Sequence, residues 1–383
     1  MHATQQATTA RHFAEEAAPG LRNSLALDSD RLVSAKAAYS VRRVNLAAAN
    51  SLLCRGISPR AGDLVLARVT QLGQHQHLES GDGRRARLWL GDEIVVAYAA
   101  RYAPDQYEAY VPDDLSPCSL VAAGGIAARV HSRHASIRPA TQIDPVGLLA
   151  DRNGDVLNVR QGALGIPSKV RPAFTIAVVG SSMNAGKTTT AASLIAGLRR
   201  LGHRVGAAKV TGTGAGGDRW LMADAGASPV LDFTDAGYAS TAGLPLDTLE
   251  LILSQLSAHV ASAGAKCLVI EVADGLLQAE TAALLQSTKF AKMVDAVIFA
   301  APDAMSVLAG ADWLHKQGLP LIAVSGVLTM SPLAMREAMA AVHLPVYTAE
   351  ELTTPRIVSA LFPILQRLSP GSALGRPGAT LQQ

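Results

Sequence analysis

The residues best suited to chemistry lie in the segment 180–190, which reads Gly-Ser-Ser-Met-Asn-Ala-Gly-Lys-Thr-Thr-Thr. This segment follows an apolar run and precedes a stretch with helical spacing, so its backbone N–H groups and the helix N-terminus can surround an anion. Lys187 can reach the β- and γ-phosphates of a nucleotide, and the Thr188 hydroxyl can bind Mg²⁺. We therefore predict a phosphate-binding loop, or P-loop, at the start of a nucleotide-binding domain.

Nearly the whole loop belongs to the predicted nucleotide site. Gly180 and Gly186 allow the chain to turn tightly and to bring its backbone close to the phosphates. A glycine-rich turn before an ordinary helix is the alternative, and the Gly-Lys-Thr-Thr run between a strand and a helix argues strongly against it. The predicted nucleotide-binding residues are Gly180, Ser181, Ser182, Asn184, Ala185, Gly186, Lys187, Thr188 and Thr189.

The spacing of the two glycines indicates a particular group of P-loop proteins. Five residues separate Gly180 from Gly186, whereas the common pattern has four. This longer loop resembles that of the dethiobiotin synthetase-like group and, more loosely, that of the molybdopterin-guanine dinucleotide biosynthesis adaptor proteins. Ser182 stands where the related partitioning ATPases carry an additional lysine. The resemblance covers residues 174–350 and is specific only around the P-loop.

The resemblance implies roles for residues outside the loop. Lys209 stands where dethiobiotin synthetases carry a lysine that helps to stabilise the reacting phosphoryl group, so Lys187 and Lys209 are the implied catalytic residues. The acidic residues that hold Mg²⁺ in that family correspond here to Asp218 and Glu271, beside Thr188. A carboxylate at the end of a buried strand suits such a site. Capping or pairing at a strand end is the alternative role for Glu271.

Two segments depart from the dethiobiotin synthetase pattern. Val272 and Ala273 stand between Glu271 and the next Gly-containing stretch. The glycine-rich run 211–218 is unlike the substrate loop of that family, and it can either bind a second anionic ligand or form a mobile loop. A similar Gly/Thr run followed by Asp-Phe, as at 232–233, occurs in a bacterial P-loop family that includes an amino-acid N-acetyltransferase. The substrate is therefore left open.

Elements that could position these residues alternate along the C-terminal half. Apolar strands joined by helices predict a parallel sheet covered on both faces, hence an α/β fold. The predicted strands are 174–179, 204–210, 267–272, 296–301, 319–324 and 345–348. The predicted helices are 188–201, 247–263, 304–316, 332–342 and 355–368. Ser325 and Gly326 follow a strand where related folds contact the base, and no guanine signature follows them, which favours adenine.

The N-terminal half has a different pattern of apolar residues. Residues 29–54 have apolar side chains at roughly helical spacing, whereas 57–168 contains short aliphatic runs separated by Gly and Asp. The second segment predicts a small β-barrel or sandwich of undefined role. The expected organisation is a leader and helical segment (1–56), a β-rich domain (57–168), a P-loop nucleotide-binding domain (169–369) and a disordered tail (370–383).

Two further clusters of polar residues in the β-rich segment are ambiguous. His75, His77 and Glu79 alternate and would share one strand face, which is half of a metal site. No second pair of ligands stands out, so a solvated hairpin is the favoured interpretation. The three arginines at 84, 85 and 87 indicate a solvated loop more readily than a phosphate-binding patch.

Composition excludes several function classes. The chain of 383 residues is 49% hydrophobic, and its formal net charge of +3 is too small for a strong nucleic-acid binder. Three widely spaced cysteines without a CxxC pair fit a reducing compartment. No apolar run approaches the ~20 residues that span a bilayer, and the N-terminus lacks the apolar core of a signal peptide. We expect a cytoplasmic globular protein.

The expected function is that of an Mg-dependent ATP-binding enzyme that activates or phosphorylates a small acidic or amide-forming substrate. The substrate would lie over the run 211–218, capped by a neighbouring subunit, because the dethiobiotin-like resemblance implies a homodimer. The alternative is a nucleotide-dependent switch or assembly ATPase whose β-rich domain binds a partner protein. The large N-terminal half favours this alternative, since a simple small-molecule ligase needs no such module.

Overall fold

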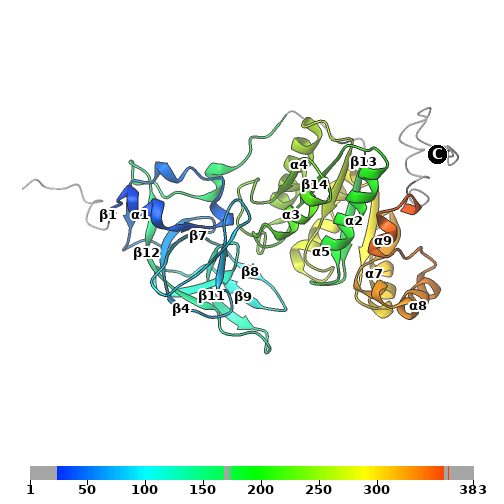
Figure 1. Cartoon of the computed structure of the whole chain (residues 1–383), viewed down its shortest axis with the longest axis horizontal. Helices are drawn as coiled ribbons and strands as arrows, with labels where there is room; N and C mark the ends of the chain where they lie inside the picture. Colours follow the sequence, from blue (N-terminus) through cyan, green and yellow to red (C-terminus); the bar gives the residue numbers. More distant parts are fainter. Residues whose placement is uncertain (1–23, 168–171, 173, 358–360, 362–383) are drawn as a thin grey trace, which may run out of the picture.

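Short apolar strands in the N-terminal half form one mixed sheet and a small hairpin in the computed structural model, which describes residues 24–167, 172, 174–357 and 361 (Figure 1). The strands are β1 (Ser24–Ala26), β2 (Lys36–Ala37), β3 (Ser51–Leu53), β4 (Leu64–Gln71), β5 (His77–Glu79), β6 (Arg85–Arg87), β7 (Glu93–Tyr98), β8 (Arg101–Tyr102), β9 (Tyr107–Tyr110), β10 (Cys118–Ala122), β11 (Ile126–Arg133) and β12 (Thr141–Ala150). Between and after them lie helix α1 (Ser29–Ser34) and the 3₁₀ turns η2 (Tyr39–Val41), η3 (Leu46–Ala48) and η4 (Val159–Gly162). The first 23 residues of the predicted leader segment, the predicted tail 370–383 and most of the predicted helix 355–368 fall outside the described residues.

Five of the strands close into a barrel. β4 pairs with β7 and β12, β12 pairs with β10, β10 pairs with β11, and β11 returns to β7. The β7–β11 pair is parallel and the other four are antiparallel. Aliphatic side chains such as Leu66, Val96, Leu120 and Ile143 are fully buried in the core around these strands. The predicted β-rich domain is confirmed, and the closed pairing makes it a barrel.

The segment 29–54, predicted as one or two helices, is mostly not helical. Helix α1 ends at Ser34, after which β2 pairs with β7 and β3 pairs with β12. Val41 and Val44 of this segment are buried in the barrel core although they lie outside the α-helix, and Val33 within α1 is 84% exposed. Pairing with the barrel outweighs a weak local helix preference in so short a segment. We propose that the β-rich domain begins before residue 57.

The C-terminal half forms a six-stranded parallel sheet in the order β15-β14-β16-β13-β17-β18. Its strands are β13 (Phe174–Gly180), β14 (Val205–Lys209), β15 (Val230–Asp232), β16 (Cys267–Glu271), β17 (Ala296–Ala300) and β18 (Leu321–Ser325). Its helices are α2 (Lys187–Arg200), α3 (Gly217–Asp224), α4 (Leu246–Ser262), α5 (Ala279–Leu285), α6 (Thr288–Met293), α7 (Ala304–Lys316), α8 (Pro332–Val342) and α9 (Ala349–Leu352), with the 3₁₀ turn η5 (Val327–Met330).

Helices cover both faces of this sheet, which confirms the predicted α/β fold. One face packs against α2, α3 and α9, and the other packs against α4 to α8. The predicted strand at 345–348 is wrong, because Val346 forms only an isolated bridge with Val324. Strand β15 and helix α3 were missed, since each is too short to give a clear hydrophobic period. No helix in the described part of the chain is long and apolar enough to cross a membrane.

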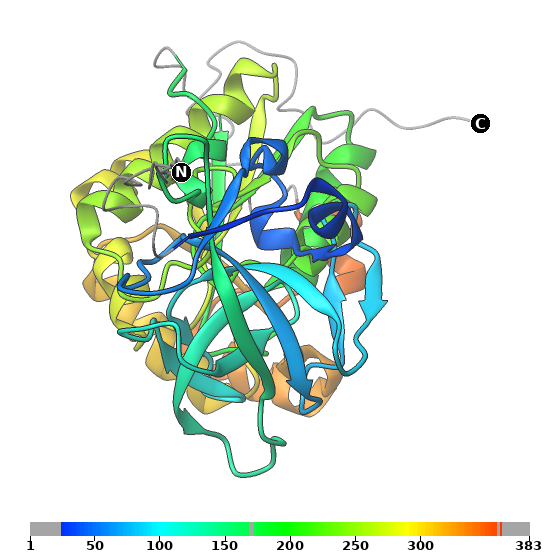
Figure 2. The ribbon, with the colours of Figure 1, turned by 90° about the vertical axis from the view of Figure 1, so that its left-hand side faces the viewer.

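The two domains touch through their backbones. Viewed from the β-rich side, the barrel strands cross in front of the helices of the second domain (Figure 2). Gly124, in the turn between β10 and β11, faces the glycine-rich loop after β14, and a Cβ at residue 124 would lie 1.9 Å from the carbonyl oxygen of Gly214. The close approach is therefore possible only for a residue without a side chain.

Substitution of Gly124 by alanine is expected to destabilise the protein by about 1–3 kcal/mol, because backbone must move to admit the methyl group. The measurement is the midpoint of denaturant unfolding. Gly165→Ala is the matched control, because a Cβ there has no atom within 4 Å. Equal midpoints for the two variants would show that the interface tolerates the added methyl group.

A buried ion network fastens the same interface. The Tyr39 hydroxyl, from η2, donates a hydrogen bond to Asp232 at the end of β15. Arg42 lies 2.8 Å from Asp235 and 3.4 Å from Asp232, and its side chain is only 9% exposed. Its guanidinium also stacks 4.1 Å from the centre of the Tyr39 ring. Charges buried this deeply need their partners, so the network holds the N-terminal segment against the second domain.

Candidate functional site

The carboxyl ends of three neighbouring strands meet beside the P-loop. β13 ends at Gly180, β14 at Lys209 and β16 at Glu271. Glu271 is in register with Lys209 on one side and with Val178 on the other. Since parallel strands present their carboxyl ends at the same edge of a sheet, residues far apart in sequence converge here. The predicted loop therefore lies next to the lysine and the glutamate that were matched to it.

The loop has the backbone expected of a phosphate-binding segment. Gly186 caps helix α2 with φ of +96°, a left-handed conformation that suits glycine. Lys187 is the first residue of α2, so the loop opens directly onto the helix N-terminus. The N–H groups there and the helix dipole favour an anion. The chain thus contains a P-loop nucleotide-binding fold.

Lys187 is held close to the loop backbone. Its side chain is buried, and its Nζ donates a hydrogen bond of 2.7 Å to the Ser182 carbonyl oxygen. Burial lowers the pKa of Lys187, and attraction to Glu271 and Asp274 offsets part of that effect. A buried ammonium group beside helix N–H groups gives the loop a second source of positive potential.

Three oxygen-bearing side chains gather next to the lysine. The Thr188 hydroxyl lies 3.2 Å from an Asp218 carboxylate oxygen and 3.1 Å from Glu271 Oε1. No described residue offers a hydrogen bond to the other buried oxygen, Glu271 Oε2. Burial raises the pKa of Glu271 to about 7, and repulsion by Asp218 adds to the rise. Attraction to Lys209 and Lys187 offsets only part of this rise.

Lys209 supplies positive charge to both carboxylates. Its Nζ donates a hydrogen bond to Asp218. Burial alone would lower the pKa of Lys209, but attraction to Asp218 and Glu271 raises it above the usual value. Burial likewise opposes ionisation of Asp218, yet Lys209 holds the pKa of that carboxyl below its usual value. The pair is thus charged at neutral pH.

Most of the predicted residues share one cavity of about 450 Å³. It is lined by Met183, Asn184, Gly186, Lys187, Thr188, Thr189, Lys209, Asp218, Glu271, Ala273, Asp274 and Val327. Gly180, Ser181, Ser182 and Ala185 belong to the loop but do not line this cavity. Asp274 lines this cavity but was not among the residues predicted from the sequence. Burial raises the pKa of its carboxyl, and attraction to Lys209 and Lys187 partly offsets that rise.

The β-rich domain contacts the site directly, which the sequence did not predict. Asn184 of the P-loop donates a hydrogen bond of 2.9 Å to Asp105, in the turn between β8 and β9. The buried Glu79 carboxylate of β5 accepts one of 3.0 Å from the backbone N–H of Gly216, at the start of α3. Helix α3 carries Asp218, so the barrel helps to position this carboxylate. These contacts join residues more than 70 positions apart, for which local sequence gives no signal.

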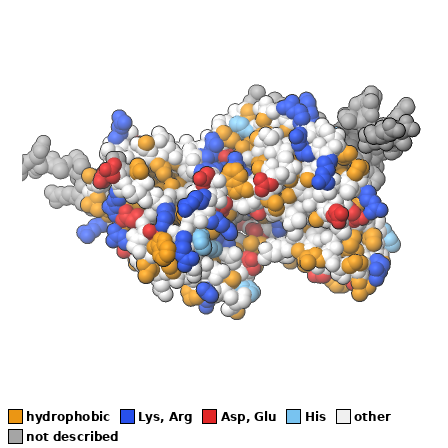
Figure 3. Space-filling model, in the orientation of Figure 1, with side chains coloured by type: hydrophobic (Ala, Val, Ile, Leu, Met, Phe, Trp, Pro, Cys, Tyr) orange, Lys and Arg blue, Asp and Glu red, His pale blue; other side chains and the backbone are white. Residues whose placement is uncertain are grey.

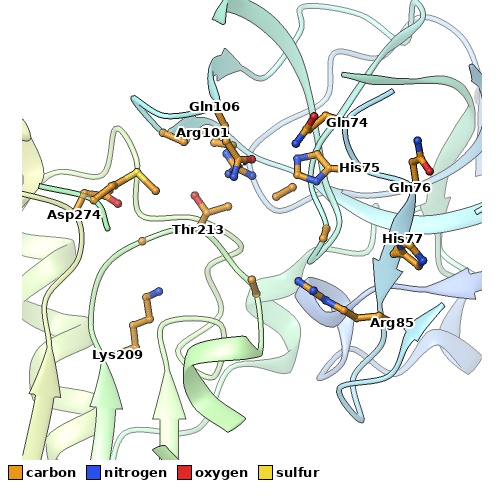
Figure 4. A pocket seen from close by; sticks show the side chains of 16 residues that line it. Gln74, His75, Gln76, His77, Arg85, Arg101, Gln106, Lys209, Thr213 and Asp274 are labelled. Carbon is orange, nitrogen blue, oxygen red and sulfur yellow. Dashed lines mark hydrogen bonds between the residues drawn. The ribbon is translucent and has the colours of Figure 1, made fainter. Parts of the chain in front are cut away.

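A second cavity of about 480 Å³ lies between the domains (Figure 4). The molecule is indented between its two lobes, with charged side chains on the walls of the indentation (Figure 3). The cavity is lined by Gln74, His75, Gln76, His77, Arg85, Arg101, Ala103, Gln106, Ala122, Ala123, Met183, Lys209, Gly212, Thr213, Ala215 and Asp274. The barrel of the same chain thus forms one wall of this cavity, and the capping by a neighbouring subunit stays a prediction.

The glycine-rich run 211–218 forms part of the floor of this second cavity. Gly212, Thr213 and Ala215 line it. The run is tied to both domains, because the Gly214 N–H donates a hydrogen bond of 2.8 Å to the Ala239 carbonyl oxygen and the Gly216 N–H donates one to Glu79 of the barrel. The run therefore faces the space into which a second ligand would fit.

The two ambiguous polar clusters have different outcomes. His75 is half-buried: its Nε2 lies 2.9 Å from the Val121 carbonyl oxygen, and burial together with Arg101 lowers its pKa to about 4. No group of three or more His, Cys, Asp or Glu side chains within the described ranges is arranged to hold a metal ion. Arg84 and Arg87 are exposed as predicted, whereas Arg85 also lines the interdomain cavity.

Comparisons with known proteins give matches among solved structures but not among family models or curated proteins. No family model matches the chain, and a search of curated proteins found none either. Among solved structures, the chain is similar to signal recognition particle 54 kDa protein from Aeropyrum pernix K1 in complex with GDP, with 19% identity, a TM-score of 0.36 and coverage of 53% of this chain and 50% of that chain. It is similar to chloroplast FtsY from Physcomitrella patens, with 15% identity, a TM-score of 0.34 and coverage of 52% and 68%.

A third similar structure is a DUF1611 family protein from Anabaena variabilis, with 15% identity, a TM-score of 0.37 and coverage of 56% of this chain and 66% of that chain. The present chain thus spans about half the length of the first of these three structures. At these identities and TM-scores, no residue role and no activity of the three proteins is assigned to this chain.

Proposed function

We propose that the protein binds Mg·ATP at the P-loop and uses it to activate or phosphorylate a small acidic substrate held between the two domains. The observation that carries this proposal is the continuity of the two cavities. Met183, Lys209 and Asp274 line both of them. A phosphoryl group bound at the P-loop would therefore face a ligand in the interdomain cavity without crossing protein.

The carboxylate cluster fits a magnesium ion. Thr188, Asp218 and Glu271 offer only oxygen atoms, which Mg²⁺ prefers, and it commonly takes its remaining ligands from phosphates and water. The unpartnered Glu271 Oε2 and the raised pKa of Glu271 are what a cation between the carboxylates would relieve. When bound, Mg²⁺ would neutralise charge on the phosphates of the nucleotide.

The chain's own residues would act by position and charge. Lys187 would bind the β- and γ-phosphates after leaving the Ser182 carbonyl. Lys209, at the junction of the cavities, would stabilise charge that develops on the transferring group. The wall formed by the barrel and the run 211–218 would orient the acceptor and exclude water, since such transfers depend mostly on positioning. The P-loop spacing shared with dethiobiotin synthetases supports this assignment.

Calorimetric titration with ATP, GTP and ADP, each with and without Mg²⁺, tests the nucleotide site. We expect magnesium-dependent ATP binding that Lys187→Ala weakens about 100-fold or more, because a buried charge contact to phosphate is lost. Thr188→Val retains the shape of the side chain but removes its hydroxyl. It should therefore weaken ATP binding in the presence of Mg²⁺ more than ATP binding in its absence. Lack of nucleotide binding by folded protein would contradict the proposal, and GTP selectivity would change its cofactor.

A nucleotide-dependent switch is the second candidate function. The hydrogen bond between Asn184 and Asp105 favours it, because nucleotide bound at the P-loop can alter a contact with the barrel directly. A switch should show slow turnover that a partner protein accelerates and small acids do not. Turnover accelerated by a small acid would support the enzyme instead.

A further inference from the structure

Arg101 is buried in the wall of the interdomain cavity without a carboxylate partner. The residue is only 8% exposed. Its Nη1 donates to the Val121 carbonyl oxygen, and its Nη2 donates a hydrogen bond of 2.9 Å to Gln106 Oε1. Across the described residues, no acceptor bonds to Nε and no acidic side chain forms an ion pair with Arg101.

An arrangement of this kind is costly unless an anion completes it. Buried guanidinium groups are normally paired with carboxylate or phosphate, because removing a charge from water costs several kcal/mol. Burial lowers the pKa of Arg101 to about 10, so the group still carries its charge at neutral pH. Attraction to Asp105 and Asp274 offsets part of the effect of burial on the pKa of Arg101, but neither carboxylate forms an ion pair with it, and the neutral His75 adds no second positive charge. The charge on Arg101 is thus available to a ligand.

Other side chains that line the cavity also carry positive charge. Arg85 extends into it from β6, and Lys209 approaches from the opposite domain (Figure 4). Asp274 is the one acidic residue among the described residues that line it. Gln74, Gln76 and Gln106 add neutral hydrogen-bonding groups around the arginines. The lining therefore suits a small polar anion better than an apolar molecule.

We propose that the barrel side of this cavity is an oxyanion subsite, in which Arg101 binds a carboxylate or phosphate group of the small-molecule substrate. The planar guanidinium fork matches either group. Gln106 orients the fork from the same turn that contacts the P-loop through Asp105. The barrel is thus the substrate-recognition module of the protein.

The position of this subsite restricts the substrate class, an inference that rests on the proposed function. The nucleotide cavity adjoins the interdomain cavity at Lys209 and Asp274, whereas Arg101 and Gln106 lie in the β-rich domain. A substrate would therefore carry two functional groups: an acceptor oxygen or nitrogen near Lys209, and an oxyanion at Arg101. Dicarboxylates and phosphorylated small alcohols are the simplest molecules of this form.

Binding of model anions to the full chain tests the subsite. The compounds are succinate, glutarate and glycerol phosphate, with succinamide as the uncharged control, and calorimetry measures each dissociation constant. We expect the dicarboxylates or the phosphate ester to bind, succinamide to bind much more weakly, and Arg101→Gln to weaken anion binding about tenfold or more. Preference between the two kinds of anion identifies the group that Arg101 binds.

Three variants besides Arg101→Gln separate the possible outcomes. Arg101→Lys retains the charge and should preserve part of the affinity, whereas Arg129→Gln removes an exposed arginine of the same domain and should change nothing. Nucleotide binding by Arg101→Gln shows that this variant is folded. Lys187→Ala should lose nucleotide binding but retain anion binding. Failure of the P-loop proposal can therefore be distinguished from failure of the oxyanion subsite. Equal anion affinity in wild type and Arg101→Gln, or no binding of any anion to wild type, would overturn the inference.

Discussion

Replacement of Lys209 by methionine is expected to reduce nucleotide turnover about 100- to 1,000-fold, the range found when one donor to a developing charge is removed. Lys209 lies where the nucleotide cavity meets the interdomain cavity. Lys209 is bonded to Asp218, whereas Lys187 is bonded to the loop backbone that would surround the phosphates. We therefore expect Lys187, and not Lys209, to provide most of the affinity for nucleotide. The loss should therefore appear in turnover much more than in nucleotide affinity.

Turnover at saturating nucleotide and a calorimetric dissociation constant, measured on the same preparation, separate these two effects. Lys316→Met is the matched control, since its ammonium pairs with Asp312 at the surface and its side chain is 69% exposed. Thermal unfolding should also show some destabilisation of Lys209→Met, because Asp218 loses its buried partner. Turnover within threefold of wild type would remove Lys209 from the mechanism.

The second large effect concerns stability. Arg42→Met is expected to lower the free energy of unfolding by about 3–5 kcal/mol, because the buried Asp232 loses its ion pair and Asp235 keeps only the partly exposed Arg43, 3.4 Å away. The side chains of Asp232 and Asp235 are only 2% and 3% exposed. The Tyr39 hydroxyl, already bonded to Asp232, cannot supply the missing charge. The loss should weaken the attachment between the domains.

Denaturant unfolding followed by fluorescence and by circular dichroism measures this change. Arg68→Met is the control, since it removes the same charge from a pair with Glu93 in which the arginine is 55% exposed, and it should cost no more than about 1 kcal/mol. If the network couples the domains, the two signals should separate in the Arg42 variant and coincide in wild type. Equal midpoints for the two variants would show that water compensates for the lost pair.

Local sequence determined the P-loop and most of the sheet around it. The segment around Lys187 has a motif whose chemistry depends on neighbours in sequence, and long apolar strands alternate with helices at a clear period. The same signals fail for β15 and α3, which are short, and for 29–54, whose helical spacing competes with pairing to the barrel. Short elements contribute little local preference, so tertiary contacts decide them.

By itself, therefore, the sequence determined a P-loop nucleotide-binding fold and a β-rich companion. Only the tertiary structure decided that the barrel covers the nucleotide domain and adds Arg101, Asp105 and Glu79 to the region around the site. Asp105 and Glu79 bond to segments far away in the chain, and Arg101 lines a cavity together with such segments, while the sequence neighbours of all three are ordinary strand and turn residues. Hydrophobic periods and motifs record local conformation, whereas a cavity between domains depends on how two completed folds pack together.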